Sequence, residues 1–387
     1  MRNNVVVITN ASLVLADRIV GESWVLIKNG RLEEFGQRSK EFGPDDTLID
    51  LGGATLFPGF IDVHIHGAVG VDTMNPTAAT LIEVGRFLAH QGVTSWMPTL
   101  VPGSNDEYTR AVESVAALNE GPRFGARIVG VHYEGPFVNH SQCGALHRQY
   151  FRTFKQKTEI DDLPRLESGR MMMTVAPEID GGIELIRELR REGWIVSIGH
   201  TRASIETLNQ AFEAGARHMT HFMNAMSPLH HRSPGPVAWG LSRDDVTCDF
   251  IADGKHLDEF VLKLLLKLKG AKGLALISDA IAAAGLGDGE YQIWGETIRV
   301  ENGCTSNAQG SIAGSVITML DAFRLMRSLG ASDVDLAEMA SLNPAKLLGL
   351  DRECGSIEVG KRADLVAIDA SGNVKLTLVG GEVAYQG

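Results

Sequence analysis

The chain has 387 residues, which is long enough for one large domain or for two or three ordinary ones. Its apolar fraction of 44% and charged fraction of 22% are those of a globular protein, and its net charge of −12 argues against binding to nucleic acid. The four cysteines are far apart and form no CxxC pair, which favours a reducing compartment over a disulfide framework. The N-terminus lacks the apolar run of a signal peptide or a membrane span. We therefore expect a cytoplasmic protein without membrane or nucleic-acid partners.

The two ends of the chain share one pattern. In residues 1–57 apolar and polar positions alternate, and turn dipeptides such as Asn29-Gly30 separate the runs, which predicts short antiparallel strands. Residues 351–387 show the same alternation. Because the ends of a chain often lie close together, we predict that both segments form one small β-sandwich domain.

The middle of the chain, residues 58–350, has a different pattern. Short apolar runs alternate with helical patterns about eight times. This repetition predicts an α/β fold, namely a (β/α)8 TIM-like barrel whose parallel strands are covered by helices. A doubly wound open sheet is the alternative, but no Gly-rich dinucleotide motif follows a strand.

Metal-binding residue types close several of the predicted barrel strands, which is where the active site of such a barrel lies. They are His64, His66, Glu134, His200, His221 and Asp279. Since alternate residues of a strand share a face, His64 and His66 can both point into the barrel mouth. Each residue alone has an ordinary structural explanation, and Asp279 in "SDA" could simply cap a helix. Their recurrence at separate strand ends favours a divalent metal such as zinc, with an open position for water.

Several motifs also resemble one enzyme family. "FPGFIDVHIHG" resembles the first barrel strand of the amidohydrolase superfamily, and "NPAKLLGL" followed by "GSIEVGKRADLVAID" resembles its return to the sandwich. "HYEGPF", "TVAPE", "IGHT", "THFMNAM", "DGKH", "ISDA" and "SIAGS" follow the order seen in N-acetylglucosamine-6-phosphate deacetylases. The resemblance covers essentially the whole chain. It implies a hydrolase that removes the acetyl group from a phosphorylated amino sugar.

The resemblance also implies a metal centre. Glu134, His200 and His221 would hold one divalent ion, with zinc as the first choice and iron, manganese or cobalt as alternatives. Some family members hold a second ion through a His-x-His pair, bridged by the glutamate. Because this chain has His64 and His66, we expect a site for one or two ions.

Two further residues would take part in the reaction. Asp279 would accept a proton from the attacking water and pass it to the departing amine. In the family, a histidine in a Gly-Ala-His-like stretch stabilises the oxyanion. Here the stretch reads "CGALHRQYF", so His147 stands one residue later than the pattern, and His140 is a weaker candidate.

The remaining implied contacts are with the substrate. The backbone N–H groups of Asn224 and Ala225 would hold phosphate oxygens. Arg232 would reach the phosphate from the neighbouring subunit of a homodimer, because a guanidinium group can donate two parallel hydrogen bonds. The sugar, phosphate or acetyl contacts that complete the set are His256, Ala313 and Gly314.

Three other interpretations remain open at this point. The substrate could be the 4-epimer, N-acetylgalactosamine 6-phosphate, since no residue in the sequence identifies the sugar hydroxyl. The chain could be a cyclic-amide hydrolase or a D-aminoacylase, although many of these bridge their metals with a carboxylated lysine where this chain has Glu134. A barrel without activity is the third, but such a protein should have lost metal ligands.

Overall fold

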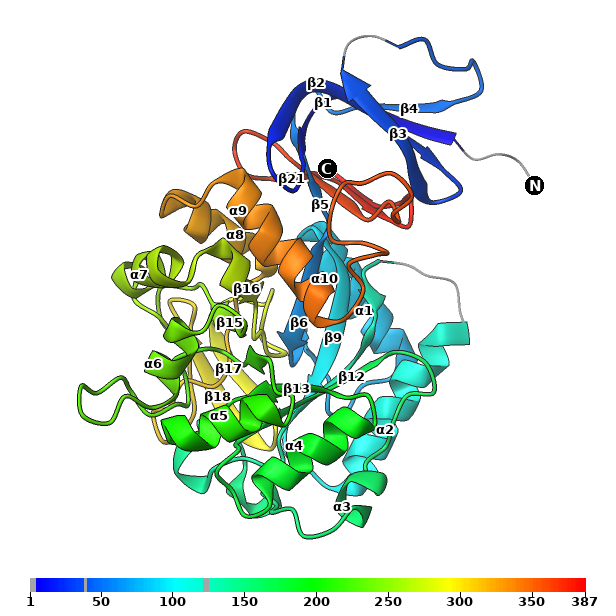
Figure 1. Ribbon diagram of the computed structural model, residues 1–387. Helices are drawn as coiled ribbons and strands as arrows, with labels where there is room; N and C mark the ends of the chain where they lie inside the picture. Colours follow the sequence, from blue (N-terminus) through cyan, green and yellow to red (C-terminus); the bar gives the residue numbers. More distant parts are fainter. Residues whose placement is uncertain (1–4, 38–39, 121–124) are drawn as a thin grey trace.

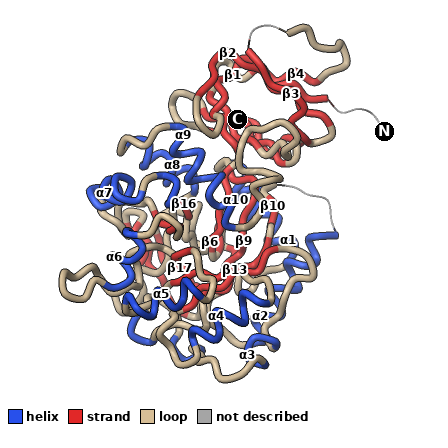
Figure 2. The backbone as a smooth tube through the Cα atoms, viewed as in Figure 1, coloured by secondary structure: helices blue, strands red, loops and turns tan. Residues whose placement is uncertain are grey.

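The computed structural model describes residues 5–37, 40–120 and 125–387 of the chain. A helix-covered barrel makes up the larger part, and a small all-β domain lies at one end of it (Figure 1). Figure 2 shows the strands of the small domain as a ring, separate from the strands inside the barrel.

Both ends of the chain contribute to the sheet of the small domain. Its strands are β1 (Val5–Val14), β2 (Ile19–Lys28), β3 (Arg31–Gln37), β4 (Thr47–Asp50), β5 (Thr55–Pro58), β20 (Leu365–Ile368), β21 (Val374–Val379) and β22 (Glu382–Gln386). Their order is β22-β21-β20-β5-β1-β2-β3, with β4 also beside β1. Val366 of β20 pairs with Phe57 of β5, which joins the two ends of the chain. Side chains such as Ile8, Leu56 and Leu376 fill a core of its own. The predicted β-sandwich from both termini is confirmed.

Parallel strands form the barrel. They are β6 (Phe60–Ile65), β9 (Val93–Leu100), β11 (Gly130–Glu134), β12 (Arg170–Val175), β13 (Ile195–Ile198), β14 (His218–Met219), β15 (Thr247–Ile251) and β16 (Leu274–Ile277), in this order around the sheet. The short β10 (Arg127–Ile128) precedes β11 and pairs with the earlier part of β9. β16 returns to β6, where the N–H of Asp279 donates to the carbonyl of His64 at 2.9 Å. The predicted TIM-like barrel is confirmed.

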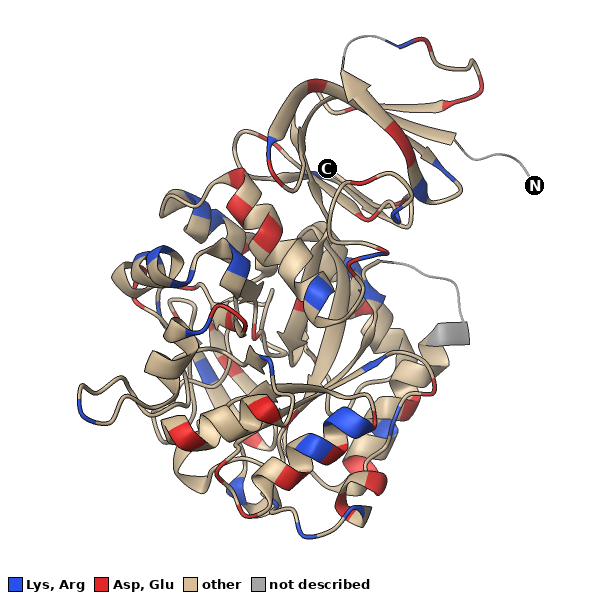
Figure 3. Cartoon of the chain, viewed as in Figure 1, with Lys and Arg blue, Asp and Glu red and all other residues tan. Residues whose placement is uncertain are grey.

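The helices pack around this sheet. They are α1 (Ala78–His90), α2 (Asn105–Ala116), α3 (Thr158–Asp161), α4 (Gly182–Arg191), α5 (Ile205–Glu213), α6 (Gly235–Ser242), α7 (Glu259–Lys269), α8 (Met319–Ser328), α9 (Asp333–Ala337) and α10 (Asn343–Leu347). Shorter turns of 3₁₀ or π type span Ala117–Glu120, His140–Gln142, Arg148–Tyr150, Ala271–Gly273 and Glu338–Leu342. Figure 3 shows acidic and basic residues interspersed along the outer helices. Over the described ranges, every helix is too short or too polar to cross a lipid bilayer.

Helix α2 illustrates why these segments are helical. Ser104 and Glu107 form a capping box, in which each side chain accepts a hydrogen bond from the backbone N–H of the other. Behind the cap, Tyr108, Val112 and Val115 recur at helical spacing and are buried. The local sequence therefore both starts this helix and chooses the face that packs on the barrel.

A three-stranded antiparallel sheet between β16 and α8 was not predicted. It consists of β17 (Gly289–Ile293), β18 (Glu296–Glu301) and β19 (Cys304–Ser306). All four residues of its two tight turns, Trp294-Gly295 and Asn302-Gly303, have positive φ, as a type I′ hairpin turn requires. Of these two dipeptides, Asn302-Gly303 is the one that indicates a hairpin turn from sequence alone. A smaller hairpin pairs β7 (Gly67–Ala68) with β8 (Val71–Asp72).

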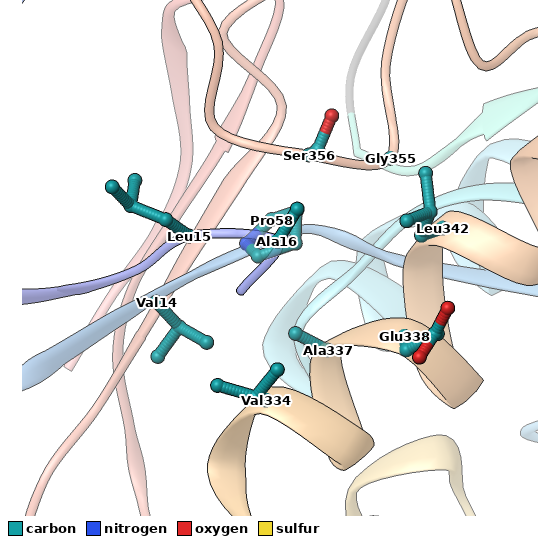
Figure 4. A pocket seen from close by; sticks show the side chains of 10 residues that line it. All are labelled: Val14, Leu15, Ala16, Pro58, Val334, Ala337, Glu338, Leu342, Gly355 and Ser356. Atoms are coloured by element: carbon teal, nitrogen blue, oxygen red, sulfur yellow. The ribbon is translucent and has the colours of Figure 1, made fainter. Parts of the chain in front are cut away.

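The two domains meet through apolar side chains. Figure 4 shows a cavity of about 10 Å³ between the end of β1 and helix α9, lined on its two sides by Val14 and Val334 among others. Phe57 of β5 packs edge-on against Phe323 of α8, with ring centroids 5.1 Å apart. This contact lies at the start of β6, so the carboxyl end of β6 points away from the sandwich (Figure 1).

The predicted limits of the domains fall close to this contact. The boundary between residues 57 and 58 lies inside β5, one residue before that strand ends. The boundary between 350 and 351 follows α10 and precedes β20. These limits remain a prediction.

Candidate metal-dependent active site

Six buried side chains converge at the carboxyl ends of the barrel strands. They form two groups, His64 with His66 and Asp279, and Glu134 with His200 and His221. Within each group the candidate ligand atoms lie within 4.8 Å of one another. The six residues that the sequence singled out are therefore brought together.

Glu134 lies between the two groups. Its Oε1 atom is 2.8 Å from Nε2 of His200 and 3.0 Å from Nε2 of His221, whereas its Oε2 atom is 3.3 Å from Nε2 of His66. Burial raises the pKa of Glu134, but the hydrogen bonds with His200 and His221 outweigh it, so its pKa lies well below the ordinary value. One oxygen faces each group, which is the arrangement that a bridging carboxylate needs.

The other group is equally tight. The Nε2 atoms of His64 and His66 are 3.1 Å apart, and Oδ1 of Asp279 lies 3.4 Å and 3.2 Å from them. Burial lowers the pKa of His64 well below its usual value. Three atoms that can act as ligands thus surround one small volume.

Backbone carbonyls set the tautomers of two of these histidines. Nδ1 of His200 lies 2.7 Å from the carbonyl oxygen of Gln142, and Nδ1 of His66 lies 3.2 Å from that of Thr99. Because a carbonyl oxygen can only accept a hydrogen bond, Nδ1 of these two rings carries a proton, and Nε2 is the atom that is directed at the carboxylates and that can bind a metal when the ring is neutral. The residues present therefore fit a divalent metal in each group.

Three of the site residues have left-handed backbone conformations. The φ values are +46° at His200, +31° at His221 and +49° at Asp279. Such conformations are unfavourable for residues other than glycine and cluster at functional sites. At His221 the N–H group donates to the carboxylate of buried Asp249, which helps to hold this conformation. The strands β13, β14 and β16 are thus each followed by a turn that carries one of these side chains.

His132, which shares a strand with Glu134, has a structural role. Its Nδ1 donates to the carbonyl of Val63 at 3.1 Å, so its Nε2 accepts the hydroxyl of Thr174 at 2.8 Å. Burial lowers the pKa of His132 to about 4, so the ring is neutral. It fills the polar interior of the barrel beneath the two groups.

A pocket of about 340 Å³ opens over the two groups. Of the predicted substrate contacts, Asn224, Ala225, His256 and Gly314 line it. Gly314 has φ +57°, and a Cβ atom there would lie 2.6 Å from Ile281 and 2.9 Å from the carbonyl oxygen of Asp279, so only glycine fits.

Two predicted backbone contacts are placed differently from the expectation. The N–H of Asn224 already donates to the carbonyl of His221 at 2.8 Å, so the side-chain amide of Asn224 is the group left to meet a ligand. Ala313 is fully buried, and its N–H donates to the hydroxyl of Thr305 at 3.2 Å. It supports the loop behind Gly314 and does not line the pocket.

Two other predicted residues lie outside this pocket. Nε2 of His147 is 3.4 Å from Oε1 of Glu296, and the ring lines a second cavity, while the preceding Leu146 lines the catalytic pocket. The part of His147 in catalysis stays a prediction, and its ring would have to leave Glu296 to fulfil it. Arg232 is exposed in the loop before α6, with Nη1 2.7 Å from Nε2 of His231. It does not reach the pocket of its own chain.

Trp294 is the main lining residue that the sequence analysis missed. It lies at the turn between β17 and β18 and lines the pocket, next to His66. Its signal was weak, because a Trp-Gly dipeptide is not one of the usual hairpin turn pairs.

The fold and the site define a class of protein. A parallel barrel with His-x-His at the end of its first strand, followed by glutamate, two histidines and aspartate at later strand ends, is the arrangement of a metal-dependent amidohydrolase. The model of the amidohydrolase family matches residues 55–384, and the chain belongs to this family.

Particular relatives are similar over almost the whole chain. The N-acetylglucosamine-6-phosphate deacetylase of Bacillus subtilis (strain 168) is 36% identical over 386 residues, covering 98% of this chain and 96% of the relative. The N-acetylgalactosamine-6-phosphate deacetylase of Escherichia coli O157:H7 is 34% identical over 331 residues, covering 85% and 87%. The crystal structure of N-acetylglucosamine-6-phosphate deacetylase from Pasteurella multocida is 28% identical, with a TM-score of 0.90 and coverage of 98% and 99%. The family resemblance inferred from the motifs is confirmed.

The position of Glu134 predicts how metal binding responds to substitution. We expect Glu134→Ala to weaken binding at both groups by roughly tenfold or more, because each group loses a carboxylate oxygen. His64→Ala should weaken binding at its own group and leave the Glu134–His200–His221 group occupied. Elemental analysis after dialysis against graded metal concentrations measures both effects. His147→Ala is the control and should keep the wild-type metal content, and full occupancy in Glu134→Ala would contradict the bridging position.

Proposed function

We propose that this chain removes the acetyl group from N-acetylglucosamine 6-phosphate by hydrolysis and releases acetate and glucosamine 6-phosphate. The observation that carries the proposal is the convergence of two metal-binding groups on one carboxylate, Glu134, at the mouth of an amidohydrolase barrel. The similarity to N-acetylglucosamine-6-phosphate deacetylases supports the substrate class.

Zinc is the metal that we propose, with iron, manganese and cobalt as alternatives. Imidazole nitrogen and carboxylate oxygen together suit a borderline divalent cation. When bound, such a cation polarises a carbonyl oxygen and lowers the pKa of a water molecule. Glu134 would hold one such cation together with His200 and His221, and a second one together with His64 and His66. The negative charge of Glu134 favours a cation over an anion between these histidines.

Asp279 is the proposed general base and acid. Two backbone hydrogen bonds fix the position of Asp279 at the end of β16. Its N–H donates to the carbonyl of His64, and its carbonyl oxygen accepts the N–H of Ser315 at 2.7 Å. The carboxylate lines the pocket beside the imidazoles of His64 and His66. It accepts the proton of the attacking water and transfers it to the amide nitrogen, which leaves as the amine.

The sugar phosphate would occupy the part of the pocket that is lined by Asn224 and His256. Asn224 offers its amide group and His256 its ring, whose Nδ1 is 2.7 Å from the carboxylate of Asp253. Asp253 thereby orients the ring so that Nε2 is left for the substrate. These polar groups lie on loops after β14 and β15.

We also propose a cytoplasmic homodimer in which Arg232 reaches the phosphate bound by the partner subunit. The supporting observation is that Arg232 is exposed and lies outside the pocket of its own chain. A planar guanidinium group suits a phosphate because it donates two hydrogen bonds in parallel.

The galacto epimer is the second candidate substrate. The Escherichia coli relative, which is 34% identical, is named for that substrate. The two sugars differ at one hydroxyl, so one hydrogen bond is enough to separate them.

The substrate assignment predicts the outcome of a direct assay. The zinc-loaded protein should release acetate from N-acetylglucosamine 6-phosphate with a kcat/KM about tenfold or more above that for N-acetylgalactosamine 6-phosphate, since one hydrogen bond contributes roughly 1.4 kcal/mol. Preference for the galacto sugar would support the second candidate. Release from neither, with metal bound, would contradict both.

The role of Asp279 predicts a loss of turnover without a loss of metal. We expect Asp279→Asn to lower kcat by about 10²–10⁴, because an amide cannot accept the proton of the water. Acetate release and metal content are measured on the same preparation. Asp17→Asn, an exposed change in the sandwich, is the control. Near wild-type kcat in Asp279→Asn would show that another group transfers the proton.

The trans position of Arg232 predicts complementation between Arg232→Ala, which binds the phosphorylated sugar weakly, and Asp279→Asn, which lacks turnover. Arg232→Ala should raise KM for the phosphorylated sugar by about tenfold or more and leave the slow reaction with unphosphorylated N-acetylglucosamine unchanged. Mixed dimers of Arg232→Ala and Asp279→Asn should regain one working site, because the intact Asp279 and the intact Arg232 then meet across the interface. An absence of recovery in verified mixed dimers would place Arg232 in its own site or away from the substrate.

A further inference from the structure

One aromatic side chain separates two cavities at the mouth of the barrel. Trp294 lies edge-on to the imidazole of His66, with ring centroids 5.2 Å apart and ring planes at 83°. It lines the catalytic pocket of about 340 Å³ and also a neighbouring cavity of about 610 Å³. Of the described residues that line these cavities, Trp294 alone borders both. The indole therefore acts as a partition.

The backbone of Trp294 is not one that favours tryptophan. Its φ is +53°, and Gly295 follows with φ +76°, in the tight turn between β17 and β18. Type I′ turns prefer asparagine, aspartate or glycine at this position, and a bulky residue with positive φ is an outlier. The turn itself does not require the indole. What the indole does at the pocket is the better explanation for its presence.

Packing under the hairpin holds the indole in place. Trp294 contacts the small apolar cluster that includes Ile281, Ile293 and Ile298. This hairpin, drawn in yellow in Figure 1, is part of the segment that joins β16 to α8. The partition is thus fixed by its own apolar support and does not depend on a ligand.

The strand order shows which end of a substrate would meet Trp294. The neighbouring cavity is lined from the loops after β6 and β9, by Met74, Val101 and Pro102 among others. The proposed sugar-phosphate contacts Asn224 and His256 follow β14 and β15. In the order β6-β9-β11-β12-β13-β14-β15-β16, β14 lies four strands from β9, which is half of the barrel. With the phosphate on that far side and the amide at the two metal-binding groups, the acyl chain points toward Trp294.

We propose that Trp294 is a specificity-determining residue that limits the acyl group of the substrate to acetyl. This inference rests on the proposed function. The indole closes the acyl end of the catalytic pocket beside His66, and the space behind it is lined by the apolar side chains of Met74, Val101 and Pro102 together with polar ones such as Asp72, Glu107 and Arg110. A propionyl or butyryl chain would enter that space only if the indole were absent.

The test is an acyl-length series on two variants. Kinetics of amine release are measured with N-acetyl-, N-propionyl- and N-butyrylglucosamine 6-phosphate. We expect Trp294→Gly to lower the ratio of kcat/KM for acetyl over butyryl by about tenfold or more, mainly through a gain on the butyryl substrate. Glycine also relieves the positive φ, so this variant should fold, and Trp294→Ala gives a second measurement. Trp294→Phe keeps an aromatic partition and should keep the wild-type ratio.

A change elsewhere on the same hairpin serves as the matched control. Gln292→Ala alters an exposed residue of β17 and should leave the acyl ratio unchanged. An unchanged ratio in folded Trp294→Gly, or a wild-type enzyme that hydrolyses butyryl as fast as acetyl, would overturn the inference.

A binding measurement separates failure of this inference from failure of the proposed function. Ligand-observed NMR compares acetate with butyrate on the metal-loaded protein, without turnover. Trp294→Gly should bind butyrate about tenfold more tightly relative to acetate than the wild type does. If the wild type hydrolyses none of the sugars, the proposed function fails, and the binding ratio still decides the role of Trp294. An unchanged binding ratio would overturn it.

Discussion

The attraction between one buried carboxylate and the imidazoles around it organises the site of this protein. Glu134 lies at the end of β11 with Nε2 atoms of three histidines within 3.3 Å of its two oxygens. A carboxylate in such a buried position is stable as an anion only when cationic or hydrogen-bonding groups surround it. The barrel supplies these groups from separate strands, so they come together only in the closed sheet.

A second layer of contacts makes this arrangement specific. Carbonyl groups of Gln142 and Thr99 hold a proton on Nδ1 of His200 and His66, so that Nε2 of each ring is the atom directed at the centre. The N–H of His221 is held by buried Asp249 in a left-handed conformation. These partners do not belong to the two metal-binding groups, but they orient the histidines that do.

We propose that loops around the mouth, rather than the strands, determine which amide the site accepts. Asn224, His256 and Trp294 all lie on such loops and line the pocket. Gly314 is confined to glycine by the close approach of Ile281 and the backbone of Asp279. The same barrel and metal site can therefore serve different amides when these few loop residues change.

The sequence by itself was enough to predict the barrel, the sandwich and the cluster of six site residues, because period-two and helical patterns are local and the barrel brings all strand ends to one edge. Only the tertiary structure determined which way the side chains of the loops point. His147 pairs with Glu296 on the unpredicted hairpin, and this leaves Leu146 in the pocket. Ala313 is turned inward by Thr305. These directions depend on partners from other segments of the chain, so no local pattern contains them, and a partition such as Trp294 becomes visible only when both cavities exist.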